Sequence, residues 1–332
     1  MTQSSPQNPR PFDRMPDGRQ VDRVTLQDGP LTATVLTMGA IIHDLRLEGV
    51  DHPLVLGCPD IATYLGAGRY LGAIVGRCAN RIGNGAFRLE GQDHQVDRNF
   101  RGRHCLHGGS VGTDAQLWQI TDLTAASVTL GLTLPDGDMG FPGTMQITAR
   151  IMVDNSTLSI VLSATTDRAT PCNLTHHGYF NLKGSDSIAA HVLQVAADHY
   201  LPVDDDLIPT GEVASVAGTP FDFRRPRPVG MSGYDHNLCL SPEPQALRPV
   251  ALLAAPEGLS MEILTTACGL QVYDGAQLDR VPGLEGRIYD AHAGMALEAQ
   301  GWPDAVNHPG FPDTILYPGQ RYSQTICYRF SR

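Results

Sequence analysis

Three short segments of the chain combine side chains that transfer protons with the alternating pattern of a β-strand. They are residues 173–182 (NLTHHGYFNL), 294–301 (GMALEAQG) and 269–275 (GLQVYDG). Successive side chains of a strand point to opposite faces, so the adjacent His176 and His177 cannot both face one site. The chemistry therefore depends on which of the two histidines shares a face with the polar side chains.

The composition of each face distinguishes the two histidines. His177 shares one face of its segment with Tyr179 and other polar side chains. His176 shares the opposite face with the apolar Phe180, so we expect His176 to pack in the interior. An imidazole changes protonation near neutral pH, which makes His177 a candidate acid or base.

The other two segments place a carboxylate and an amide on open faces. Met295 and Leu297 form the apolar face of residues 294–301, which leaves Glu298 on the other face. Gln271 faces out of its segment in the same way. A histidine and a carboxylate in one groove are suited to general acid–base catalysis. The alternative for each residue taken alone is a solvated glutamate or a hydrogen-bonded structural histidine.

The elements that must position these side chains are predicted to be β-strands. The chain has 332 residues with 35 Gly, 24 Pro and 18% charged residues, which indicates many turns and few long helices. Short alternating runs follow one another from Gln20 to the end, and helical turns are expected only at 59–68 and 241–249. We predict an all-β fold, with one large antiparallel β-sandwich over 16–332 after a disordered lead-in at 1–15.

The charge and the cysteines limit the partners and the compartment. A formal net charge of −11 argues against nucleic-acid and membrane partners, which require clustered cations. The 7 cysteines contain no C-x-x-C pair, which favours reduced thiols in the cytoplasm. His104 and His107 lack a third ligand at suitable spacing, so no metal is expected. The N-terminus lacks the apolar core of a signal peptide, and no apolar run approaches the ~18 residues that cross a bilayer.

A series of motifs in order along the chain resembles the aldose 1-epimerase, or galactose mutarotase, family. The resemblance covers roughly residues 20–330 and implies a β-sandwich of the galactose-mutarotase type. It also implies cofactor-free interconversion of the α and β anomers of a free aldohexose, such as glucose or galactose, by a monomer or homodimer. The motifs are GRCANRIGNGAFRLEG, LHGG, NLTHHGYFNL, LPVDDDLIPTGEVASVAGTPFDFR, YDHNLCL, GLQVYDGAQLD and LEAQGWPDAVNHPGFPDTILYPG.

The resemblance implies a role for individual residues. His177 would be the general acid and Glu298 the general base, on opposite sides of the sugar. His176 and Gly178 stand where the family usually has Asn and Ser, which alters the surroundings of His177. Phe221 and Trp302 are candidates, with Tyr179, for stacking on the sugar. The implied substrate-binding residues are Asn80, Arg81, His107, Tyr179, Asp235 and Gln271.

Other functions use the same groove differently. A non-catalytic carbohydrate-binding or sugar-sensing protein would not need both His177 and Glu298. An epimerase of hexose phosphates would need extra cations, for which the arginines of 100–104 (FRGRH) and 223–228 (FRRPRP) are candidates. A glycosidase would need a second catalytic carboxyl group, and only Asp235 is available.

Overall fold

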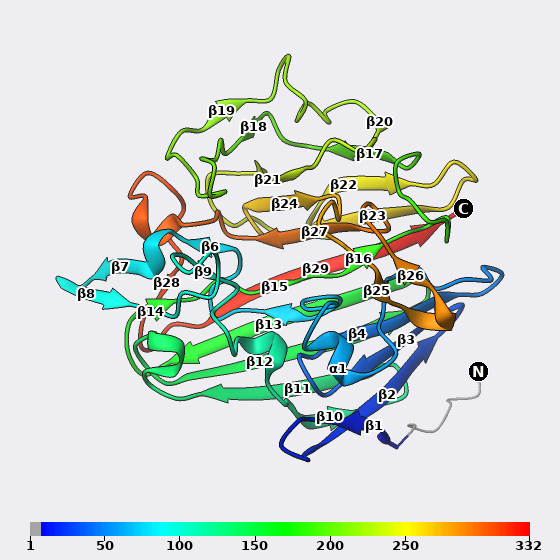
Figure 1. Ribbon diagram of the computed structural model, residues 1–332, viewed down its shortest axis with the longest axis horizontal. Helices are drawn as coiled ribbons and strands as arrows, with labels where there is room; N and C mark the ends of the chain where they lie inside the picture. Colours follow the sequence, from blue (N-terminus) through cyan, green and yellow to red (C-terminus); the bar gives the residue numbers. More distant parts are fainter. Residues whose placement is uncertain (1–7) are drawn as a thin grey trace.

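The computed structural model describes residues 8–332, and nearly all of its regular structure is β-strand (Figure 1). The strand pairs within this described range are antiparallel, apart from one isolated parallel bridge between Cys78 and Asn173. The predicted all-β, antiparallel fold is therefore confirmed.

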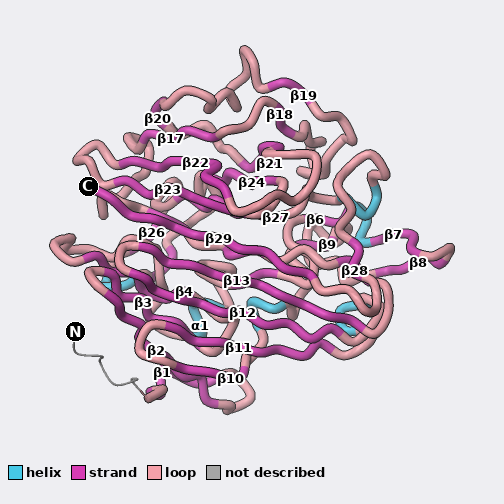
Figure 2. Tube along the Cα trace, turned by 180° about the vertical axis from the view of Figure 1, so that it is seen from behind, coloured by secondary structure: helices cyan, strands magenta, loops and turns pink. Residues whose placement is uncertain are grey.

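The largest sheet has nine strands, which Figure 2 shows side by side across one face of the molecule. In spatial order they are β10 (Gln119–Leu123), β11 (Ser127–Leu134), β12 (Met145–Asp154), β13 (Thr157–Thr166), β29 (Tyr322–Ser331), β23 (Ser260–Thr265), β22 (Arg248–Ala254), β17 (Val192–Val195) and β20 (Arg227–Pro228). Burial alternates along β12, because its apolar side chains face the core and its polar ones face solvent.

Two smaller sheets contribute to the other layer. One contains β1 (Arg10–Arg14), β2 (Gln20–Asp28), β3 (Leu31–Leu36) and β4 (Ile42–Leu47). The other contains β16 (Tyr179–Phe180), β27 (Met295–Gln300), β24 (Gly269–Tyr273), β21 (Asp235–Cys239), β18 (His199–Tyr200) and β19 (Ala214–Ser215). One hydrophobic core joins side chains of all three sheets, such as Leu26, Ile263 and Leu297. This is the sandwich packing that the sequence predicted.

Short elements cover the outer face of the six-stranded sheet. Every residue of β27 is buried, because loops cover the face of this strand that the sandwich core does not. The two-stranded ladders are β5 (Ile74–Val75) with β15 (Thr175–His176), β6 (Arg81–Ile82) with β9 (Cys105–Leu106), β7 (Ala86–Leu89) with β8 (Gln92–Gln95), β14 (Thr170–Pro171) with β28 (Ile315–Leu316), and β25 (Val281–Pro282) with β26 (Ile288–Tyr289).

The helices are few and short, as predicted. The expected turn at 59–68 contains α1 (Ile61–Tyr64), which Asp60 caps by accepting a hydrogen bond from the Thr63 amide. No helix among residues 8–332 is both long and apolar enough to span a membrane. The remaining helical turns are of the 3-10 type, at Gly83–Gly85, Thr113–Ala115, Asp138–Gly140, Leu284–Gly286 and Ala305–Asn307.

Two local predictions are wrong. The segment 241–249 is not helical, because it contains three prolines, which interrupt helical hydrogen bonding. The lead-in expected at 1–15 does not hold for Arg10–Arg14, which forms β1. This strand pairs with β2, and Phe12 packs against a buried cluster. Residues 1–7 of that predicted lead-in lie outside the described residues.

Candidate active site

A cavity of about 220 Å³ lies on the outer face of the six-stranded sheet, and it brings together most of the predicted site residues. Glu298 comes from β27, Asp235 from β21 and Tyr179 from β16, while the two-stranded ladders and the adjoining loops supply the other predicted residues. Gln271 is the exception, because it lies behind Asp235 and not on the cavity wall. The predicted residues that line the cavity are Asn80, Arg81, His107, His177, Tyr179, Asp235 and Glu298.

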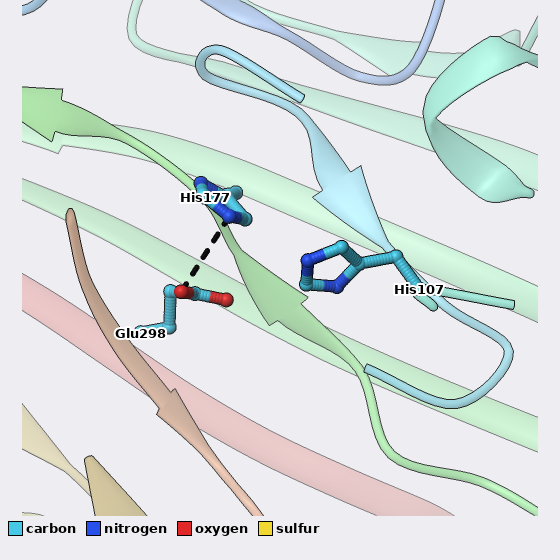
Figure 3. Close-up of side chains that lie close together, drawn as sticks. All are labelled: His107, His177 and Glu298. Atoms are coloured by element: carbon cyan, nitrogen blue, oxygen red, sulfur yellow. Dashed lines mark ion pairs between the residues drawn. The ribbon is translucent and has the colours of Figure 1, made fainter. Parts of the chain in front are cut away.

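His177 and Glu298 both line this cavity, and their side chains point toward each other (Figure 3). The distance from His177 Nε2 to Glu298 Oε1 is 3.5 Å, and both side chains are buried. The two groups thus lie side by side, which corrects the expected arrangement on opposite sides of a sugar. Adjacent groups are better suited to a cyclic hemiacetal, because its hydroxyl oxygen and its ring oxygen are bonded to the same carbon.

The surroundings of this pair favour uncharged forms. Burial raises the pKa of Glu298 well above its usual range, and the nearby Asp235 carboxylate raises it further. Burial also lowers the pKa of His177 to about 4. Burial therefore favours the protonated form of Glu298 and the neutral form of His177, whose imidazole can accept a proton.

His107 is held as a hydrogen-bond donor. Its Nδ1 accepts a hydrogen bond of 3.1 Å from the backbone amide of Asn80, so the proton of the neutral ring is on Nε2. Burial lowers the pKa of His107 well below its usual value, which keeps the ring neutral. The ligand atoms of His107, His177 and Glu298 lie within 4.8 Å of one another, but a protonated Nε2 has no lone pair for a metal ion. A hydrogen-bond donor at this position suits a sugar oxygen better than a cation.

Asp235 is held between two partners. Arg81 donates a hydrogen bond of 3.0 Å to Oδ2 of Asp235, and Gln271 donates one of 2.6 Å to Oδ1. The Arg81 guanidinium also lies over the Phe100 ring, 4.7 Å from its centroid. These contacts fix a carboxylate at the cavity wall, where its remaining lone pairs can accept hydrogen bonds from hydroxyl groups.

The aromatic side chains of the cavity differ from those expected. Tyr179 lines it, but its ring stacks on His177 at a centroid distance of 5.1 Å. Phe221 packs against Tyr200, and Trp302 packs against Phe311, so neither of these candidates is part of the wall.

Sequence reasoning missed three aromatic residues that line the cavity: Tyr70, Phe100 and Tyr273. Alternation places Tyr273 on the same open strand face as Gln271, although Tyr273 was not among the predicted site residues. Tyr70 and Phe100 are in loops, where no periodicity marks a side chain as facing a site.

Two other histidines considered from the sequence, His176 and His104, do not line the cavity. His176 packs in the core, as predicted, with its Nδ1 3.0 Å from the hydroxyl of Tyr328. His104 contacts Asp206 through Nε2 at 3.1 Å. His104 and His107 therefore do not share a site.

The arginines proposed for a phosphate do not line the cavity. Arg101 and Arg103 form ion pairs with Asp206, and Arg224 pairs with Asp222. Within the described residues, the cationic side chains on the cavity wall are Arg69 and Arg81, and each pairs with an aspartate.

The amino-acid sequence is similar to those of two enzymes over nearly its whole length. Galactose mutarotase of Homo sapiens is 38% identical, over 96% of this chain and 97% of that protein. Aldose 1-epimerase of Escherichia coli K12 is 36% identical, over 95% of this chain and 96% of that protein.

Solved structures agree with these relatives. An aldose epimerase homologue from C. elegans superimposes with a TM-score of 0.88 at 30% identity, covering 94% of this chain and 99% of that one. A galactose 1-epimerase from Lactobacillus acidophilus gives 0.86 at 29% identity and covers 99% of each chain. The family model described as aldose 1-epimerase matches residues 22–329, and the chain belongs to this family.

Proposed function

We propose that this protein is an aldose 1-epimerase that interconverts the α and β anomers of a free aldohexose, such as glucose or galactose. The observation that carries the proposal is the contact between His177 and Glu298 in a cavity whose other walls donate and accept hydrogen bonds. The family to which the chain belongs supports it.

The pair supplies the one proton that ring opening requires. Transfer of a proton from Glu298 to His177 gives an imidazolium and a carboxylate, the forms that the family resemblance implies for acid and base. His177 then protonates the ring oxygen while Glu298 takes the proton of the C1 hydroxyl. The bond from C1 to the ring oxygen breaks, the C1 carbonyl forms, and the pair returns to the neutral state that burial favours.

The open aldehyde rotates about its C1–C2 bond, and ring closure on the other face reverses these proton transfers. His107 donates through Nε2 and would stabilise negative charge that develops on an oxygen at C1. Asp235, fixed by Arg81 and Gln271, would accept hydrogen bonds from sugar hydroxyls. Asn80 would fix His107 through its backbone amide.

The proposal is tested by polarimetry on freshly dissolved α-glucose and α-galactose. Glu298→Gln and His177→Asn should each reduce the accelerated rate by at least about 100-fold. Glu262→Gln and His199→Asn are matched controls, because these side chains lie outside the cavity. A parental rate in either site variant, with folding confirmed by circular dichroism, would contradict the assignment.

The alternatives are separated by substrate and by binding. A sugar-binding protein would bind glucose in calorimetry without accelerating its mutarotation. A hexose-phosphate epimerase would prefer the phosphate, which the paired arginines of the cavity do not favour. A mutarotation assay with glucose, galactose, arabinose and glucose 6-phosphate, together with calorimetry on the same sugars, therefore distinguishes the three functions.

We also propose a cytoplasmic location and a monomeric or homodimeric state. All 7 cysteines are free and buried, which is typical of proteins in a reducing compartment. Cell fractionation tests the location. Sedimentation of the 35.8 kDa chain tests the oligomeric state.

A further inference from the structure

Two tyrosine rings pack near the imidazole of His177 and lie nearly parallel to it. The Tyr179 ring is inclined to it by 24°, and the Tyr70 ring by 23° at a centroid distance of 6.0 Å. Tyr70 also contacts His107, with ring centroids 4.7 Å apart. Tyr70 therefore touches both histidines of the cavity, and the reaction described above gives it no role.

Packing, and not a hydrogen bond, orients the His177 ring. Within the described residues, Nδ1 of His177 is buried without a hydrogen-bond partner. Its Nε2 is 3.5 Å from Glu298, which is longer than an ordinary hydrogen bond. A base or acid in a catalytic site usually needs a third group that holds its ring in place. Here the neighbouring aromatic rings are the groups in position to do so.

Tyr70 is itself firmly held. The guanidinium of Arg69 lies over its ring at 4.8 Å and is anchored by a hydrogen bond of 3.1 Å to Asp114. The backbone of Tyr70 has a φ of +72°, a left-handed conformation that is costly for a bulky residue and that persists only where the surroundings enforce it.

The same loop also holds the backbone of His177. The Gly72 amide donates a hydrogen bond of 2.9 Å to the His177 carbonyl, and the His177 amide donates one of 2.8 Å to the Ala73 carbonyl. The loop that carries Tyr70 thus contacts His177 at its main chain and at its ring.

We propose that Tyr70 is a positioning residue, whose ring holds the imidazole of His177 in the orientation required for proton exchange with Glu298 and the sugar. The expected effect on the reaction rate rests on the proposed function. The packing of Tyr70 near His177 does not depend on that function. The ring and not the hydroxyl makes the stacking contacts, so phenylalanine should replace tyrosine and leucine should not.

The kinetic test compares Tyr70→Leu with Tyr70→Phe. Misorientation of a catalytic group by about 1 Å can cost about 100-fold in rate, so we expect kcat of Tyr70→Leu to fall about 10- to 100-fold. KM should stay within about twofold, because the groups proposed to bind hydroxyls remain in place. Tyr70→Phe should restore most of kcat. Tyr317→Leu is a matched control, since Tyr317 is an exposed tyrosine outside the cavity.

A second measurement needs no activity. The imidazole protons of His177, assigned by their loss in His177→Asn, should shift in the NMR spectrum of substrate-free Tyr70→Leu but not in that of Tyr70→Phe. Unchanged His177 signals and a parental kcat in Tyr70→Leu would overturn the proposal, as would a Tyr70→Phe variant as impaired as Tyr70→Leu. If the parent protein accelerates no mutarotation, the proposed function fails, and the NMR comparison still decides the role of Tyr70.

Discussion

Gly178 lies so close to the His176 ring that a side chain at position 178 would overlap with it. This contact predicts the effect of adding one methyl group to Gly178. A Cβ at Gly178 would lie 2.3 Å from Cε1 of His176, whereas ordinary van der Waals contact begins at 3.4 Å. The His176 ring cannot move away freely, because it is fully buried and contacts the hydroxyl of Tyr328 at 3.0 Å. The overlap is therefore a case of overpacking, and Gly178→Ala should cost about 1–3 kcal/mol of unfolding free energy.

Removing the ring should remove this cost. His176→Asn alone should destabilise the protein by about 1–3 kcal/mol, since it deletes the contact with Tyr328 and leaves a small cavity. In that background Gly178→Ala should cost less than about 0.5 kcal/mol, so the coupling energy of the pair should be about 1 kcal/mol or more.

Urea unfolding of the four proteins, followed by circular dichroism, measures the double-mutant cycle. Gly218→Ala does not serve as a control, because its φ is +75°, whereas Gly310→Ala does, because no atom lies within 4 Å of the added Cβ. Equal costs of Gly178→Ala in the two backgrounds would refute the steric reasoning, even if both costs were large.

Three further predictions concern charge. Glu298→Gln should be inactive yet more stable than the parent at pH 8. Burial raises the pKa of the Glu298 carboxyl group in the folded protein, so the parent loses stability as pH rises above the pKa of this group in the unfolded chain. Equal urea midpoints at pH 8, with a difference at pH 4, would contradict this. Burial lowers the pKa of His43 to about 4, so the stability that its neutral ring contributes is lost as pH falls from 6.5 towards 4. Between pH 7 and 4, the free energy of unfolding of the parent should therefore fall by about 3 kcal/mol more than that of His43→Asn, as measured by urea titration. Asp235→Asn should raise KM for galactose about 10- to 100-fold in polarimetric assays, because a charged acceptor is lost; a parental KM would exclude Asp235 from substrate binding.

Local alternation in the sequence determined the orientation of the two proposed catalytic side chains. It placed His177 and Glu298 on open faces and His176 in the interior, because side chains of any extended segment point to alternate sides whatever strands pair with it. It also determined the all-β class, because short apolar runs between turns cannot form long helices.

Tertiary structure decided the rest, because pairing between strands and the course of loops depend on residues far apart in the sequence. The 3.5 Å contact between His177 and Glu298 exists because segments more than a hundred residues apart meet over one sheet. Gln271 has the predicted strand face, but its hydrogen bond to Asp235 directs it behind the wall. Tyr70 reaches His177 through a left-handed loop conformation, which no periodic pattern encodes.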